Sequence, residues 1–388
     1  MKLFRLLPAI LAFSFILLTA CEKELDGTLN PSTSDMLSAE ATERLGQSDF
    51  SFPDGLEKRL EAPSLLLHTH PEYRDMVLRA LGAIEPTPCD SNTPLNQWLS
   101  QELSDWNAEM RFYANATAMY DLPTYDALVF ENSSKNQYFG PEGEYTKPLT
   151  KAFKDLQRFW DIQSDDIVLV AMHGNMLLDR DKLLRTYEAA FGLSPADAAY
   201  YADLVLLLLE TYPQYRNGNH PIFTFNAFAL EGFNYPPYAN IPDKIVMGDG
   251  IMEAYTALGY DDVAPQAILA HEFGHHIQFQ LDLFEEVSSP EATRRTELMA
   301  DAYAAYYLSH ARGASMQWKR VQQFLEVFFN IGDCGFTSNG HHGTHTQRMA
   351  AAEWGYQLAD NAQKQGHILS SQEFAQLFDA QLPELVLL

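Results

Sequence analysis

Two histidines and a glutamate stand within five residues, in the order His-Glu-Phe-Gly-His from His271 to His275. A helix turns each residue by about 100°, so His271 and His275 project from nearly the same side, one turn apart. Two neutral imidazoles placed in this way can bind one metal ion, and Glu272 can reach a metal-bound water without being a ligand. The spacing predicts a zinc hydrolase in which the glutamate takes a proton from that water.

The motif is short enough to arise by chance in a chain with 12 histidines, so the surrounding segment matters. In residues 267–281 the apolar side chains recur at helical spacing, and no proline interrupts them. Gly274 costs roughly 1 kcal/mol relative to alanine inside a helix, and we expect this small residue to let another element approach closely. His276 points about 100° away from His275, so we expect it to lie at the surface or to support the site.

A second helix is predicted to begin near Ser288, and it carries Glu297 and Asp301 four residues apart on one face. A catalytic zinc takes three protein ligands and one water, and because the third ligand can be a carboxylate, Glu297 is our candidate. Asp301 is placed to accept a hydrogen bond from a ligand imidazole and so to fix its tautomer. The alternative is an ordinary solvated face, but neighbours such as Leu298 and Met299 are apolar, and buried carboxylates need partners.

A further histidine cluster occupies residues 341–348. Thr344 and Gln347 have the spacing of a capping box, which gives Gln347 a structural role that weighs equally with a functional one. His342 lies just ahead of the predicted helix, where a loop can reach a neighbouring cleft. It is our first choice for a catalytic donor to a developing oxyanion. The weaker candidates for that donor are two tyrosines, Tyr303 and Tyr306.

Together these stretches resemble the bacterial neutral zinc metallopeptidase family. The family pattern HExGHHxQ is matched by residues 271–278, the pattern ELxAD by residues 297–301, and the pattern HGTxxQR by residues 342–348. The three patterns follow one another in the family's order, which is far more specific than the first motif alone. The resemblance extends over roughly 240–360, or about a third of the chain.

The resemblance implies a zincin-like fold with one Zn²⁺ per chain. It implies His271, His275 and Glu297 as the zinc ligands and Glu272 as the general base. Ala302 stands where the family usually has a cysteine, which indicates a divergent branch.

We therefore expect a zinc metallopeptidase, an endopeptidase that hydrolyses peptide or protein substrates. An aminopeptidase would need an acidic pair to capture the substrate amine, and we find no motif for one. Two alternatives remain open at this point: a zinc amidase that acts on cell-wall peptides, and a non-catalytic binding lipoprotein that keeps a zincin fold.

The beginning of the chain is typical of an export signal. Lys2 and Arg5 precede an apolar run from Leu6 to Leu18, and small residues then lead to Cys21. This resembles a bacterial lipoprotein signal peptide at residues 1–20, which implies cleavage before Cys21 and a lipid anchor on it. An uncleaved anchor is the alternative, but the run is shorter than the roughly 20 residues that span a bilayer. The expected location is the cell envelope, at the outer membrane or cell surface.

Two cysteines remain after Cys21, and an oxidising compartment would allow them to pair. We therefore consider a disulfide between Cys89 and Cys334, with two buried free thiols as a nearly equal alternative.

The charge of the chain narrows its partners. Lys and Arg number 26 against 52 Asp and Glu, a formal net charge of −26 at pH 7. Such a chain repels nucleic acid and anionic surfaces, so we expect no nucleic-acid partner. The acidic residues are spread along the chain, which indicates solubility rather than one cationic partner.

The remaining pattern predicts the organisation of the chain. We expect a flexible tether at residues 21–60, a mainly helical segment of unknown role at 61–145 and the metallopeptidase domain at 146–388. The predicted helices cover residues 149–160, 182–191 and 194–212, and the predicted strands cover residues 166–172, 222–230 and 244–247. A small mixed sheet before the histidine helix and a mainly helical half after it give an α+β fold.

Overall fold

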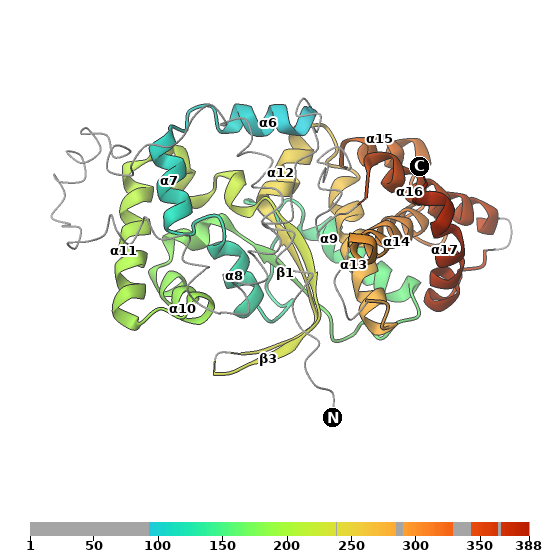
Figure 1. Cartoon of the computed structure of the whole chain (residues 1–388), viewed down its shortest axis with the longest axis horizontal. Helices are drawn as coiled ribbons and strands as arrows, with labels where there is room; N and C mark the ends of the chain where they lie inside the picture. Colours follow the sequence, from blue (N-terminus) through green and yellow to red (C-terminus); the bar gives the residue numbers. More distant parts are fainter. Residues whose placement is uncertain (1–92, 238, 285–289, 329–342, 364–365, 388) are drawn as a thin grey trace.

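A small mixed sheet lies among many helices in the computed structural model of the chain (Figure 1). The structure describes residues 93–237, 239–284, 290–328, 343–363 and 366–387. A mixed, mainly helical architecture with few strands confirms the α+β class predicted from the sequence. The α-helices are α6 (Pro94–Glu102), α7 (Ala108–Ala116), α8 (Leu122–Val129), α9 (Thr146–Phe159), α10 (Arg180–Phe191), α11 (Pro195–Thr211), α12 (Asp249–Ala257), α13 (Ala264–Gln280), α14 (Pro290–Ser309), α15 (Trp318–Phe328), α16 (His345–Gln363) and α17 (Ser371–Leu385). The 3₁₀ helices are η3 (Gly174–Leu178), η4 (Pro213–Gly218) and η5 (Pro221–Thr224).

Three strands form the main sheet in the order β1-β5-β2. They are β1 (Val168–Met172), β5 (Lys244–Gly248) and β2 (Ala227–Leu230). Since β1 runs parallel to β5, the carboxyl ends of both strands meet, with Met172 beside Gly248, whereas β2 runs antiparallel to β5. A separate antiparallel pair joins β3 (Phe233–Tyr235) and β4 (Ala239–Ile241).

β1 and β2 fall within predicted strands, and β5 extends one residue beyond the strand predicted at 244–247. The strand predicted at 222–230 is shorter than expected, because η5 occupies residues 221–224 and only β2 follows as strand. Pro221 opens η5, and a proline has no N–H to donate to a neighbouring strand, so the ladder begins after it.

Different helices cover the two faces of the sheet, because successive side chains of a strand point to opposite faces. Leu169 and Ile245 point to the face that α9, α12 and α13 cover. Val170 and Val246 point to the face covered by α8 and α10. In Figure 1, α8 and α10 accordingly lie on one side of the sheet and α9 and α13 on the other. Burial on both faces explains why β1 is apolar throughout.

The predicted helices are confirmed with small changes at their ends. Those predicted at 149–160, 182–191 and 194–212 correspond to α9, α10 and α11. The side chain of Ser194 accepts a hydrogen bond from the backbone N–H of Asp197 at 3.2 Å and so caps α11.

The described part of the predicted segment 61–145 packs against helices that follow it in the sequence. Side chains of α7 share a hydrophobic cluster with side chains of α10 and α11. Two buried tyrosines add hydrogen bonds across this contact: the hydroxyl of Tyr187 donates to Thr117 O at 2.5 Å, and that of Tyr215 donates to Met110 O at 2.6 Å.

Close backbone contacts hold α14 between α13 and α16. A Cβ on Gly274 of α13 would lie 3.2 Å from the Cα of Ala300 on α14, which is the close approach that we expected at this glycine. A Cβ on Gly355 of α16 would collide with the carbonyl oxygen of Ala302. Ala300 and Ala302 lie about 200° apart around the helix, so α13 and α16 pack against opposite sides of α14.

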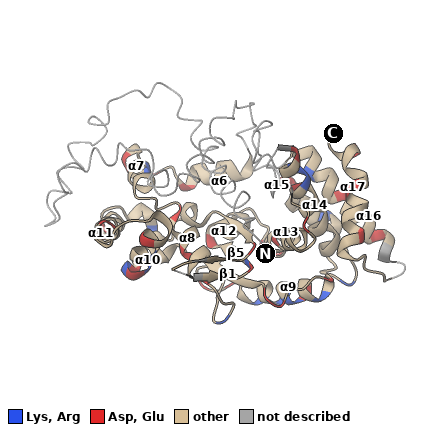
Figure 2. Ribbon diagram, turned by 60° about the horizontal axis from the view of Figure 1, so that its bottom comes forward, with Lys and Arg blue, Asp and Glu red and all other residues tan. Residues whose placement is uncertain are grey.

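Charged residues are distributed unevenly over the surface. Acidic residues occur on most of the described elements, whereas the outer face of α9 is mainly basic (Figure 2). The exposed basic residues of α9 are Lys147, Lys151, Lys154 and Arg158. Within the described ranges, no helix is both long and apolar enough to cross a membrane.

Candidate metal centre

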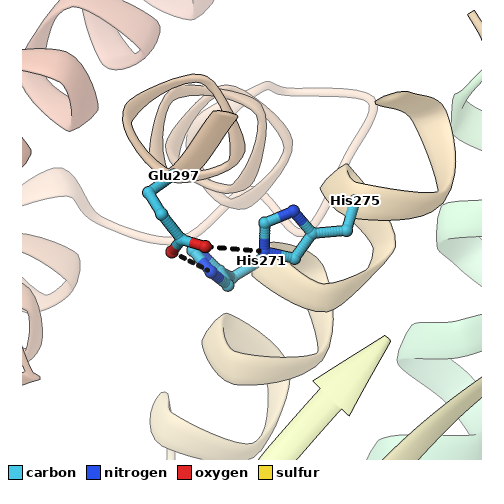
Figure 3. Close-up of side chains that lie close together, drawn as sticks. All are labelled: His271, His275 and Glu297. Atoms are coloured by element: carbon cyan, nitrogen blue, oxygen red, sulfur yellow. Dashed lines mark ion pairs between the residues drawn. The ribbon is translucent and has the colours of Figure 1, made fainter. Parts of the chain in front are cut away.

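Three side chains from two helices converge on one point. His271 and His275 lie one turn apart on α13, and Glu297 reaches them from α14 (Figure 3). Nε2 of His271 lies 3.4 Å from one carboxylate oxygen of Glu297, and Nε2 of His275 lies 3.5 Å from the other. The donor atoms are all within 4.8 Å of one another, and in the described part of the chain this is the one buried group of its kind.

These separations suit an ion of the size of zinc. Two ligand atoms bound at about 2.0–2.1 Å in a tetrahedral arrangement stand about 3.3–3.4 Å apart. The observed nitrogen–oxygen distances of 3.4 and 3.5 Å are close to that value. Two imidazoles and one carboxylate are also a donor set that leaves a fourth position for water or substrate. The group formed by His271, His275 and Glu297 could therefore hold a metal ion.

A carboxylate on the neighbouring turn orients the first imidazole. Oδ1 of Asp301 lies 3.0 Å from Nδ1 of His271, which leaves Nε2 to face Glu297. This is the position that the sequence predicted for Asp301. The guanidinium of Arg348 on α16 donates two hydrogen bonds to the same carboxylate, from Nε to Oδ2 and from Nη2 to Oδ1, both at 2.8 Å. The sequence does not predict this role for Arg348, because Arg348 and Asp301 are 47 positions apart and meet only through the packing of α16 on α14.

A neutral amide orients the second imidazole. Nδ1 of His275 lies 2.9 Å from Oε1 of Gln278, and Nε2 of Gln278 donates to Thr296 O at 2.7 Å. Because its NH₂ group donates to this carbonyl, the amide presents oxygen to His275, and the imidazole carries its proton on Nδ1. Nε2 then faces Glu297. Sequence reasoning gave Gln278 no role, although its place three residues after His275 was a usable indication.

Glu272 is buried beside the three donor residues, with 3% of its surface exposed. Burial raises the pKa of its carboxyl to about 7, and the nearby charge of Glu297 adds to the rise. The backbone N–H of Ala229 on β2 forms a hydrogen bond to the same carboxylate and opposes the rise. A carboxyl with its pKa near neutrality can both accept and return a proton under physiological conditions.

The two imidazoles of the group differ in proton affinity. Burial alone would lower the pKa of His271, but hydrogen bonds to Asp301 and Glu297 outweigh it and raise the pKa to about 10. Burial lowers the pKa of His275 to about 4. In the metal-free chain at neutral pH, His271 is therefore the imidazole that carries the positive charge.

His276 does not lie at the surface, and that part of our prediction was wrong. Its ring is fully buried, and Nε2 lies 2.9 Å from Lys244 O on β5. The ammonium of Lys244 in turn donates to carbonyl oxygens at the end of α8, including Leu128 O at 2.7 Å and Glu131 O at 2.8 Å. His276 therefore attaches α13 to the central strand and is not one of the three converging donor residues.

Tyr303 and Tyr306 do not provide the oxyanion donor that we considered for them. Both are fully buried, and the hydroxyl of Tyr303 donates to Ser371 O at 2.8 Å. The hydroxyl of Tyr306 accepts from Leu369 N–H at 3.0 Å. Both rings belong to an aromatic cluster around Phe374, so they stabilise the contact with α17.

The capping box predicted ahead of α16 is confirmed. The backbone N–H of Gln347 donates to Oγ1 of Thr344 at 3.1 Å, and the N–H of Thr344 donates to Oε1 of Gln347 at 3.1 Å. Gln347 also donates to Val386 O at 3.0 Å, so its observed contacts are structural. Gly343, the residue before this box, lies against Leu298 of α14, directly after Glu297 in the sequence.

Several predicted residues lie outside the described ranges. They are His342, the lipidation candidate Cys21 and the disulfide candidates Cys89 and Cys334. The roles assigned to them remain predictions from the sequence.

Comparison with known proteins does not extend this picture: no protein family, no curated protein and no solved structure matches the chain. The group formed by His271, His275 and Glu297 is therefore the main indication of function.

Proposed function

We propose that this protein is a zinc-dependent peptidase. The observation that supports the proposal is the position of Glu272, a buried carboxyl of raised pKa next to a three-donor group of the kind that binds zinc. Burying a carboxylate costs stability even with the hydrogen bond from Ala229 N–H, which favours a chemical role for Glu272 over a structural one. The zincin-like fold implied by the motifs belongs to the same proposal.

Each residue then has a distinct task. His271, His275 and Glu297 would hold the ion, which when bound supplies an activated water and polarises the carbonyl of the scissile bond. Glu272 accepts the proton that the attacking water loses and returns it to the nitrogen of the leaving amine. Asp301 keeps the ligand imidazole oriented throughout, and the oxyanion donor expected at His342 completes the proposal.

The position of β2 as an outer strand of the described sheet supports an extended peptide as the substrate. Gly248 N–H donates to Asn226 O, and the antiparallel ladder alternates from there, so the backbone groups of Ala227 and Ala229 point away from β5. Ala229 N–H forms its hydrogen bond to Glu272, so this edge passes directly beside the proposed base. Outer strands of a sheet can bind an extended peptide through backbone hydrogen bonds, as an added strand.

The opposite edge of the sheet is closed to such a peptide. Leu169 N–H on β1 donates to Oγ of Ser134 at 2.8 Å, and Ala171 N–H donates to Oε1 of Gln137 at 3.0 Å. The outward N–H groups of β1 are thus bonded to side chains of another segment, whereas the outer edge of β2 runs beside Glu272, so we place the substrate along β2.

Replacing the base tests the mechanism. Glu272→Gln should bind zinc in the same ratio as the parent chain and lose turnover by about 10²–10⁴-fold, because only proton transfer is removed. Glu253→Gln is the matched control: the pKa of Glu253 is also raised by burial, but this residue lies on α12 rather than beside the three donor residues. Undiminished peptide hydrolysis by Glu272→Gln would contradict the mechanism.

A digest of a mixed peptide library, read by mass spectrometry, tests the substrate class. Internal cleavage of linear peptides is the expected result. Cleavage confined to cell-wall peptides would favour the amidase alternative, and stoichiometric zinc without hydrolysis of any substrate would favour a binding protein.

A further inference from the structure

Two stacked aromatic rings adjoin the candidate metal centre. The rings of Phe279 and Phe284 lie 4.8 Å apart between their centroids, with an interplanar angle of 22°. The centroid of the Phe284 ring lies 6.3 Å from that of His275. Among the three donor residues, His275 has the most exposed side chain, at 11% against 2% for His271 and 8% for Glu297. The aromatic pair therefore adjoins the donor residue that is nearest to solvent.

Helix geometry places Phe279 on the face of α13 that carries the proposed base. Each residue turns a helix by about 100°, so Phe279 projects about 20° from Glu272 and about 40° from His275. A rise of about 1.5 Å per residue separates Phe279 from His275 by about 6 Å along the axis. One step of an extended peptide covers about 3.3 Å, and a long side chain covers the rest. The pair is thus within reach of a residue that flanks a carbonyl bound at the donor group.

Hydrogen bonds fix the turn that carries Phe284. The backbone N–H of Leu283 donates to Gln278 O at 3.0 Å, and Leu283 O accepts from Nη1 of Arg295 at 2.7 Å. Arg295 is itself held by Asp379, to which its Nε donates at 2.7 Å. Because Phe284 follows this bonded residue directly, its ring is in place before a ligand arrives. A surface that is already ordered loses little conformational freedom on binding, which favours affinity.

Packing of the core does not account for the pair. Leu281 and Leu283 on the same turn pack against the main hydrophobic cluster, whereas neither phenylalanine belongs to a hydrophobic cluster of the described chain. Both phenylalanines are partly exposed. Phe279 also contacts the buried ring of His276, with 5.5 Å between the centroids, which anchors the pair to α13. Exposed apolar surface beside polar groups is typical of a ligand-binding groove.

We propose that these two rings select the substrate, a peptide with a large apolar side chain on a residue that flanks the scissile bond. The inference rests on the proposed peptidase function and names its substrate class. With the peptide along β2, the flanking side chain covers Phe279 and Phe284 and removes apolar surface from water. A small side chain leaves the rings exposed, and a charged one loses hydration against them. Both phenylalanines determine specificity and take no part in proton transfer.

Two hydroxamates that differ only in their side chain test the inference without turnover. Acetohydroxamic acid and 3-phenylpropanohydroxamic acid carry the same metal-binding group, and the second adds a benzyl group. In calorimetric titrations of the zinc-loaded full chain, we expect the larger compound to bind about tenfold more tightly. In Phe284→Ala this preference should fall below about threefold, while acetohydroxamic acid binds as it does to the parent.

Phe112→Ala is the matched control. Phe112 is also partly exposed, but it lies on α7 and packs against Tyr113 rather than beside the donor residues, so this variant should keep the parent's preference. Phe279→Ala is a second variant, should Phe284→Ala not fold, because alanine is the best helix former and preserves α13. It should lower the preference in the same way. In a digest of a mixed peptide library by the parent, large apolar residues should be enriched beside the cleaved bonds.

Equal binding of the two hydroxamates by the parent would overturn the inference, as would a preference that is unchanged in both Phe284→Ala and Phe279→Ala. Enrichment of acidic or basic residues beside the cleaved bonds would also overturn it. All three results leave the proposed peptidase function intact, because acetohydroxamic acid still binds or peptides are still cleaved. Failure of both compounds to bind the zinc-loaded chain would instead contradict the proposed function, and this inference with it.

Discussion

The molecule contains two histidine–aspartate pairs that share one construction and differ in what they face. In both, a buried carboxylate lies against Nδ1 of an imidazole: Asp301 at 3.0 Å from His271, and Asp249 at 2.7 Å from His173. In both, the consequence is the same, because the pairing directs Nε2 away from the carboxylate and fixes the ring.

What differs is the surrounding of each ring. Nε2 of His271 faces the carboxylate of Glu297 at 3.4 Å, whereas His173 lines a polar cavity. Asp301 is itself held by the guanidinium of Arg348, whereas Asp249 is held by a backbone N–H. An aspartate therefore orients an imidazole for binding without determining which ligand it binds. The groups opposite Nε2 decide it.

Removing each histidine should separate the two pairs most strongly. His271→Phe removes one of three donors, so we expect zinc affinity to fall by about 10³-fold or more and hydrolysis to disappear with it. His173→Phe should leave zinc affinity and hydrolysis within about twofold of the parent, since its ring is not part of the donor group. Competition with a chromophoric chelator measures both affinities. Equal zinc loss in the two variants would remove the distinction between the pairs.

Neutralising each aspartate gives the next largest effect. Asp301→Asn should lower zinc affinity by about 10–100-fold, as is usual for the orienting partner of a ligand histidine. It should also lower the stability of the fold, because Arg348 is buried and loses its charged partner. Asp249→Asn should leave zinc affinity unchanged, because Asp249 contacts His173 and Gly140 rather than the three donor residues. The same chelator competition, together with thermal unfolding, checks these expectations, and normal zinc affinity in folded Asp301→Asn would refute the role given to Asp301.

The pH dependence of zinc binding should identify the protonated ring. Between about pH 7.5 and 9 the metal-free chain keeps a proton on His271, whose pKa is raised to about 10, and none on His275, whose pKa is lowered to about 4. Zinc must displace that one proton, so its apparent affinity should rise about tenfold for each pH unit. The His173→Phe variant should show the same slope. A slope of zero or of two protons in chelator competition would contradict the assignment.

The smallest effect should come from the neutral orienting group. Gln278→Met removes the amide that faces Nδ1 of His275, and we expect zinc affinity to fall by less than about tenfold, since a neutral hydrogen bond is weaker than one to a carboxylate. A loss greater than that of Asp301→Asn in the same assay would show that charge is not what distinguishes the two orienting groups.

Local spacing was enough to predict much of the site and of the fold. Four residues separate His271 from His275 and Glu297 from Asp301, and helix geometry turns both intervals into shared faces. The box that caps α16 could be predicted for the same reason, because its partners are three residues apart. Strands and helices were located by periodicity, with errors mainly at their ends.

Contacts between distant segments could not be predicted in this way. Nothing in the sequence states that Arg348 meets Asp301 or that His173 meets Asp249, since each contact depends on how whole elements pack. Tyr303 was misjudged because nearness in sequence was taken for nearness in space. It lies about 200° around the helix from Asp301, which turns it toward the aromatic core.

Diffraction data from crystals of the zinc-loaded protein, collected on both sides of the zinc absorption edge, would show whether His271, His275 and Glu297 bind the ion. We expect a single anomalous peak at about 2.0–2.2 Å from Nε2 of His271, Nε2 of His275 and an oxygen of Glu297. An absent peak, or a peak beside other residues while this group stays empty, would rule out these three residues as the zinc site.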